Sequence, residues 1–96
     1  MIFEKIQKDL KEALKARDNL RVSTLRFLLA AVHNRKIEKQ TELTEEDILA
    51  VIRQQVKQHQ ESIAAYQQGK RDDLVNKEQL ELAILNTYLP QQMGDE

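Results

Sequence analysis

The fold is decided by the segment Gly69-Lys70-Arg71-Asp72-Asp73-Leu74-Val75-Asn76-Lys77-Glu78 and by the Tyr88-Leu89-Pro90 block that follows it. Gly69 predicts the end of one helix, because glycine readily takes the left-handed conformation that closes a helix. Asp72 or Asp73 is expected to accept the free amide hydrogens in the first turn of the next helix. Pro90 ends that helix, since proline has no amide hydrogen and disfavours the helical conformation at the preceding residue.

Four segments of the chain carry apolar residues at helical spacing, and we expect helices over residues 2–17, 19–40, 45–68 and 73–89. Asp18 is the expected cap of the second helix, and Thr44 opens the third with a capping box. Short connections favour antiparallel neighbours, so the predicted fold is all-α, a compact four-helix arrangement. Residues 1–90 are expected to form the helical domain, and residues 91–96 lack periodicity and are expected to fray.

The composition excludes several classes of protein. The chain has 96 residues, which suit one domain, and it has no cysteine, which excludes disulfides, thiolate metal sites and a cysteine nucleophile. Its apolar runs are shorter than the roughly 18 residues that would span a membrane. The first five residues include Glu4 and Lys5 where a signal peptide would be apolar. We therefore expect a cytoplasmic protein without membrane contact.

Charge is distributed unevenly along the chain. Residues 1–43 contain ten Lys and Arg against six Asp and Glu, whereas residues 44–96 contain five against ten. A basic first half can meet an acidic partner such as RNA, but the two halves can equally neutralise each other within the fold.

Three polar residues fall on apolar helix stripes, namely Lys36, His59 and Glu78. In one interpretation Lys36 and Glu78 extend their charged ends to solvent and His59 is a hydrogen-bonded core histidine. In the other, a partly buried His59–Glu78 or Lys36–Glu78 pair forms, which would be costly to break from one side.

A second apolar strip on the last helix is formed by Leu80, Ile84 and Tyr88. Such a strip indicates a second contact, either with another helix of this domain or with a partner. We retain both alternatives.

No catalytic, cofactor-binding or metal site is predicted. A glycine-rich phosphate loop is missing, and His33 and His59 do not have the spacing of a metal-binding pair. Ser23 and Ser62 fall in mid-helix, where hydroxyls usually bond to the preceding turn. We expect an apolar interior without a cleft, and a protein that works through its exterior.

Nucleic-acid binding has more support from the sequence. Basic residues that can contact phosphates gather in and around the second predicted helix. They are Arg17, Arg21, Arg26, Arg35, Lys36 and Lys39. Their angles around the helix are scattered, and aromatic residues do not alternate with them, so only recognition of an RNA backbone or shape is expected.

The chain resembles the first helical part of the YqeY-like (GatB/YqeY) family, which is similar to the tail region of the B subunit of the aspartyl/glutamyl-tRNA amidotransferase. The resemblance covers nearly the whole chain. It is specific because the Gly-x-Arg-x-Asp-Leu…Lys-Glu block and the Tyr-Leu-Pro block occur together. The matching blocks are Leu20-Arg21 to Arg26 with Asn34, residues 43–47, 56–58 and 61–62, Tyr66, Gly69-x-Arg71-x-Asp73-Leu74-Val75, Lys77-Glu78, Glu81-Leu82, Leu85 and Tyr88-Leu89-Pro90-Gln91-Gln92-Met93. Two features depart from the family pattern. His59 stands where members usually carry another basic residue, and this sequence ends at Glu96, where members usually continue into a second helical subdomain. We expect either a piece cut at the subdomain boundary or a short natural member.

The resemblance implies a non-catalytic accessory module in tRNA-dependent amidotransferase biology. A carbon–nitrogen ligase label, with glutamine as amide donor, would be inherited by association, because the Ser-Lys amidase pattern is missing. The implied partners are tRNA or an amidotransferase subunit, and the oligomeric state is left open. The expected RNA or partner surface comprises Arg21, Arg26, Arg35, Arg71 and Lys77. For Arg71 and Asp73 an ordering role in the turn is an alternative to a functional surface. The rival function is a protein-interaction adaptor that uses Leu80, Ile84 and Tyr88 without touching RNA.

Overall fold

The computed structural model describes residues 2–90 and confirms an all-α protein. Its four helices are α1 (Ile2–Ala16), α2 (Asn19–Lys39), α3 (Glu45–Gln68) and α4 (Asp72–Asn86). Each begins within one residue of its predicted start. None of these helices is long and apolar enough to cross a membrane.

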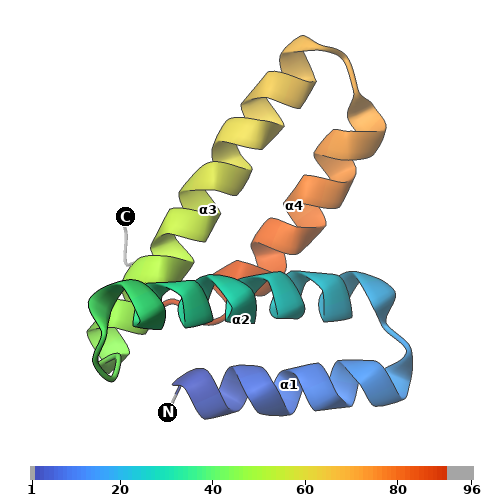
Figure 1. Cartoon of the computed structure of the whole chain (residues 1–96). Coiled ribbons are helices and arrows are strands. Elements are labelled where there is room, and N and C mark those ends of the chain that lie inside the picture. Colours follow the sequence, from blue (N-terminus) through green and yellow to red (C-terminus); the bar gives the residue numbers. More distant parts are fainter. Residues whose placement is uncertain (1, 91–96) are drawn as a thin grey trace.

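The helices form two antiparallel hairpins that cross each other (Figure 1). α1 lies beside α2, α3 lies beside α4, and α2 contacts both helices of the second hairpin. The far end of the α3–α4 hairpin projects away from the first hairpin. The crossing therefore brings the middle of α2 next to facing positions of α3 and α4.

The core lies at this crossing and draws on all four helices. Ile6, Leu25, Leu28, Ile52 and Leu85 are the largest fully buried side chains. Removing a Leu or Ile side chain from water contributes about 1.5–3 kcal/mol, so these residues supply much of the driving force for joining the hairpins.

The apolar strip predicted at Leu80, Ile84 and Tyr88 packs mainly within the domain. Ile84 and Tyr88 are 7% and 5% exposed and belong to the core, whereas Leu80 is 57% exposed. The Tyr88 hydroxyl donates a hydrogen bond of 2.6 Å to Asp9 Oδ2 on α1. A partner surface made of all three side chains is therefore not available, because two of them already join α4 to the rest of the fold.

The predicted caps of α2 and α3 are confirmed. The Asp18 side chain accepts a hydrogen bond from the Arg21 amide. Thr44 and Asp47 form a reciprocal capping box, in which each side chain accepts from the other residue's amide. Lys39 also contacts the Asp47 carboxylate, which joins the end of α2 to the start of α3. This contact, followed by the Thr44 amide, lowers the pKa of Asp47 to about 2.

The turn between α3 and α4 differs from the prediction. Gly69 has φ of −83°, and Lys70 takes the left-handed conformation with φ of 58°. Arg71 precedes α4 without a side-chain cap, so neither Asp72 nor Asp73 acts as the cap. Both aspartates instead lie in the first turn, where their negative charge favours the positive end of the helix dipole. The left-handed position was misplaced by one residue because glycine suggests such a site without requiring it.

α4 ends at Asn86, three residues before its predicted end. The amides of Thr87, Tyr88 and Leu89 bond to carbonyls three residues back, so the last turn tightens before Pro90 is reached. The predicted fraying of residues 91–96 lies outside the described residues.

Candidate functional site

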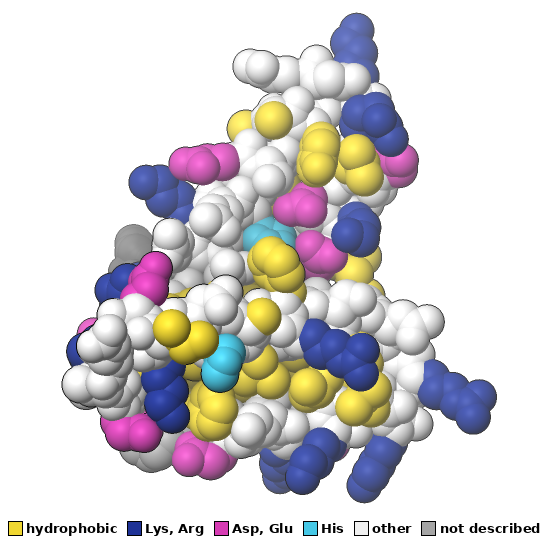
Figure 2. Space-filling view, in the orientation of Figure 1, with side chains coloured by type: hydrophobic (Ala, Val, Ile, Leu, Met, Phe, Trp, Pro, Cys, Tyr) yellow, Lys and Arg dark blue, Asp and Glu magenta, His cyan; other side chains and the backbone are white. Residues whose placement is uncertain are grey.

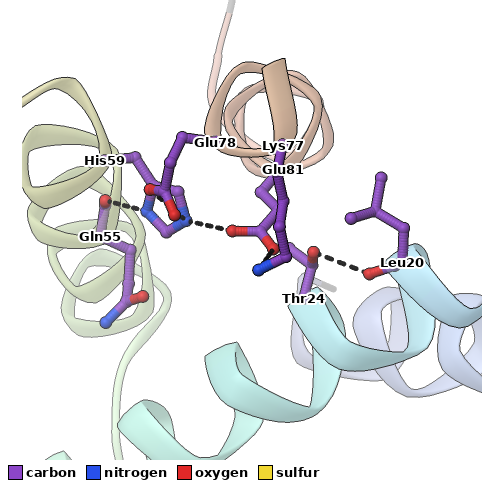
Figure 3. Close-up of polar contacts among 7 residues, drawn as sticks. All are labelled: Leu20, Thr24, Gln55, His59, Lys77, Glu78 and Glu81. Carbon is purple, nitrogen blue, oxygen red and sulfur yellow. Dashed lines mark hydrogen bonds and ion pairs between the residues drawn. The ribbon is translucent and has the colours of Figure 1, made fainter. Parts of the chain in front are cut away.

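The crossing of α2 over α3 and α4 leaves a hollow of about 410 Å³. His59 and Gln55 come to it from α3, Glu78 and Glu81 from α4, and Thr24 from α2 (Figure 3). The expectation of an apolar interior without a cleft is corrected here, because ionisable side chains converge where the hairpins meet.

His59 is held in one orientation by the backbone of its own helix. Its Nδ1 lies 2.9 Å from the Gln55 carbonyl oxygen, which can only accept, so Nδ1 carries a proton. Its Nε2 lies 3.1 Å from Glu81 Oε1 and 3.8 Å from Glu78 Oε1. The predicted pairing of His59 with Glu78 is thus confirmed, whereas Lys36 pairs with Glu42 at 3.4 Å rather than with Glu78.

Three side chains form what we term the His–Glu cluster, namely His59, Glu78 and Glu81. Their side chains are 12%, 17% and 11% exposed, and their ligand atoms lie within 4.8 Å of one another. Lys77 donates to the second oxygen of Glu81 at 3.1 Å, and this hydrogen bond raises the pKa of Lys77. Lys77, predicted as a surface residue, therefore supports the cluster from the rim.

The chemistry of the cluster follows from the proton on Nδ1. In a neutral imidazole protonated there, Nε2 carries a lone pair, and this lone pair faces two carboxylates. Three acceptors that point together need a proton, a cation or a donating water molecule between them. The spacing of residues in the sequence did not predict the cluster as a whole, because its members come from two helices. The position of Glu81 on the same face of α4 was nevertheless visible, since Glu81 lies three residues after Glu78 and four before Leu85.

The other residues of the predicted RNA or partner surface do not form one basic surface. Arg21 lies 3.6 Å from Asp18, Arg35 lies 3.5 Å from Glu38, and Arg71 lies 3.3 Å from Asp73. The pairing with Arg71 holds the pKa of Asp73 below its usual value, which favours the turn-ordering role of these two residues. Arg26 is exposed on α2. RNA contact by this set remains a prediction.

A second group of basic residues lies on α1, on a face that also carries Glu4 and Glu12. Lys8, Lys11 and Lys15 share its exposed face, and Arg17 follows in the turn to α2. Within residues 2–90 none of these four forms an ion pair with an acidic side chain. Figure 2 shows Lys and Arg side chains projecting along the lower right edge of the molecule, over the end of α1 and the α1–α2 turn. We term these four residues the basic stripe; the spacing i, i+3, i+7 was visible in the sequence.

The two oppositely charged halves of the chain do not neutralise each other through many direct contacts. Over the residues that the structure describes, Lys39–Asp47 is the one ion pair that joins residues 1–43 to residues 44–90. The other ion pairs lie within one half. The excess positive charge of the first half is therefore largely presented to solvent.

Comparison with known protein families identifies the family of this four-helix chain. Residues 3–96 match the model of the family described as Yqey-like protein. The chain therefore belongs to the YqeY-like family, as the resemblance predicted.

Curated relatives are proteins named altered inheritance of mitochondria protein 41, mitochondrial. The protein from Kluyveromyces lactis is 39% identical over 84 residues, covering 86% of this chain and 45% of the relative. The protein from Vanderwaltozyma polyspora is 35% identical over 85 residues, covering 88% of this chain and 46% of the relative. The chain thus spans about half the length of these relatives.

The predicted cytoplasmic localisation is contradicted by these names. The relatives from both yeasts, and that from Eremothecium gossypii, are named as mitochondrial proteins. The charged residues near Met1 that led to the prediction are therefore a poor guide to the compartment in this family.

Proposed function

We propose that this chain is a non-catalytic RNA-binding module that contacts the phosphate backbone of a folded RNA through the basic stripe. The observation that carries the proposal is the alignment of Lys8, Lys11 and Lys15 on one exposed helix face, continued by Arg17, without acidic partners in the described structure. Unpaired cations attract phosphates and release the counterions condensed on them, which drives association.

The spacing of the basic stripe suits several phosphates of one RNA strand. Lys8 and Lys15 are seven residues apart, which on an α-helix corresponds to about 10 Å. Aromatic residues do not lie among the four members, so base stacking is not offered and readout is of backbone and shape. The family resemblance suggests tRNA as the RNA and amidotransferase-dependent amide formation as its setting.

The test is binding of a labelled tRNA to the purified chain by fluorescence anisotropy, at salt concentrations from 25 to 300 mM. Each phosphate contact contributes about 0.7–0.9 to the slope of log affinity against log salt. The triple variant Lys8→Gln/Lys11→Gln/Lys15→Gln should therefore lower this slope by about 2–3 and weaken binding at low salt at least tenfold.

The matched control removes three charges from α2, in the variant Arg21→Gln/Arg26→Gln/Arg35→Gln. This variant should change the salt slope and the RNA affinity less, because Arg21 and Arg35 already pair with acidic side chains. An equal or larger loss in this control would move the RNA surface to α2. Absence of wild-type binding at 25 mM salt would refute the RNA function and favour the protein-interaction adaptor.

A further inference from the structure

We propose that the His–Glu cluster binds a divalent transition-metal ion, with His59 Nε2 and one oxygen each of Glu78 and Glu81 as ligands. The site is formed by two helices and opens onto the hollow between them and α2. It shares no residue with the basic stripe, and the proposal is independent of RNA binding.

The positions of the ligand atoms fit a tetrahedral ion. Ligand atoms that lie about 2.0–2.2 Å from tetrahedral Zn²⁺ are about 3.3–3.5 Å apart. His59 Nε2 lies 3.1 Å from Glu81 Oε1 and 3.8 Å from Glu78 Oε1, so the two distances bracket that value. The oxygens of Glu78 and Glu81 lie within 4.8 Å of each other, so closing the site around an ion requires adjustment of the two glutamate side chains.

Two neighbouring groups orient the proposed ligands. The Gln55 carbonyl accepts from His59 Nδ1 and thereby leaves Nε2 free to coordinate. Metal-binding histidines in proteins regularly donate their other ring N–H in this way. Lys77 holds Glu81 Oε2, which leaves Oε1 directed at the histidine. Both contacts fix the orientation of the proposed ligands.

Glu78 provides an independent sign that a cation is needed. Its side chain is 17% exposed, and its one contact of ion-pair distance in the described part of the chain is with His59 Nε2 at 3.8 Å, beyond hydrogen-bond distance. With a neutral imidazole, the two carboxylates and Lys77 leave one net negative charge in a site that is largely removed from water. A divalent ion compensates this charge and gives Glu78 a direct ligand bond.

The donor set and the hollow define the class of ion. One imidazole nitrogen and two carboxylate oxygens suit Zn²⁺ and the neighbouring first-row ions better than Ca²⁺ or Mg²⁺, which prefer oxygen ligands alone. Three protein ligands leave a fourth position, which faces the hollow between Thr24 and Gln55. A site of this kind can hold a water molecule or an anionic group of a ligand.

The experiment uses the full chain after treatment with a chelator. Zn²⁺ binding is measured by isothermal titration calorimetry, and Co²⁺ binding by its visible absorption, which reports tetrahedral coordination. We expect one equivalent of Zn²⁺ per chain and a Co²⁺ spectrum of tetrahedral intensity. His59→Gln and Glu78→Gln should each weaken binding at least tenfold.

His33→Gln is the matched control, because His33 is the other histidine and is exposed on α2. It should leave affinity and stoichiometry unchanged. Circular dichroism of each variant checks that the helices persist, and the wild-type titrations do not depend on any variant folding. Failure of the wild-type chain to bind either ion stoichiometrically would overturn the proposal. Binding that survives His59→Gln, or that falls equally in His33→Gln, would also overturn it.

Discussion

Replacing Tyr88 with phenylalanine tests how the end of α4 is attached to α1. The substitution removes only the hydroxyl, which donates to Asp9 Oδ2 at 2.6 Å, and it keeps the ring that packs in the core. A hydrogen bond to a charged group contributes about 1.5–3 kcal/mol. The Asp9 side chain is 23% exposed and can regain water, so we expect a loss near the lower limit, about 1.5 kcal/mol. For a domain of this size that loss lowers Tm by about 6–12 °C.

The pH dependence of the same variant reports the ionisation of the buried Tyr88 hydroxyl. Burial, followed by the hydrogen bond to Asp9, raises the pKa of Tyr88 above its ordinary value. The folded state therefore holds this proton more tightly than the unfolded state does. The resulting stability is fully present below about pH 10, the unfolded pKa of tyrosine, and is lost as pH rises toward the folded value. The stability difference between wild type and Tyr88→Phe should therefore shrink above pH 10.

Urea denaturation followed by circular dichroism measures both effects, at pH 7 and at several values between 9 and 11. Asp9→Asn and the double variant complete a cycle, in which the two single losses should not add. A Tyr88→Phe protein as stable as wild type at pH 7 would refute the role of the hydroxyl.

Five further substitutions, at three places in the fold, test stability and are measured by thermal or urea unfolding. Gly69→Ala should be tolerated or should stabilise the protein by about 0.4–1 kcal/mol, because φ of Gly69 is negative and an added Cβ meets its nearest atom at 3.7 Å. Lys70→Gly should stabilise the protein by up to about 1 kcal/mol, because it relieves a left-handed φ. A destabilising effect of both substitutions would contradict the observed turn. Thr44→Ala should lower the free energy of unfolding by about 1 kcal/mol. Asp47→Asn should flatten the fall in stability between pH 4 and 2, because the lowered pKa makes the stabilisation by the Asp47 carboxylate present above pH 3.8 and lost below it. An unchanged fall in stability at acid pH would argue against the capping box. Ile52→Ala should cost about 2–5 kcal/mol, because Ile52 is fully buried; a loss below 1 kcal/mol would mean that the crossing repacks freely.

Much of the fold was predictable because its signals are local. Asp18 and Thr44 cap helices through side chains that reach only three residues along the chain, so their roles can be read without knowing the tertiary structure. The same reasoning failed at Gly69, where the next residue takes the left-handed conformation. A single glycine marks a region where a turn is easy, but the packing of α3 against α4 selects the residue that turns.

The candidate site was predictable only in part, since it depends on which helix faces meet. His59 and Glu78 could be singled out because each interrupts an apolar stripe. Glu81 and Lys77 were not assigned to the cluster. Their mutual contact is local, four residues apart on α4, whereas the contact of Glu81 with His59 depends on which face of α3 meets α4. Ile84 and Tyr88 were ambiguous for the same reason: a second apolar strip shows that something covers it, and only the fold shows that α1 and α2 contribute to the cover.

Packing alone does not explain ionisable residues at the crossing. Val75 and Leu85 are buried on α4 on either side of Glu78 and Glu81, so apolar side chains are accommodated on this face of the helix. Buried ion clusters often stabilise a protein no better than hydrophobic residues of similar volume, because removing charges from water offsets their attraction. Ligand bonds to a metal ion would compensate that cost, which gives His59 and both glutamates a reason to stay polar. The basic stripe on α1 shares none of these residues, so loss of metal binding should leave RNA affinity intact.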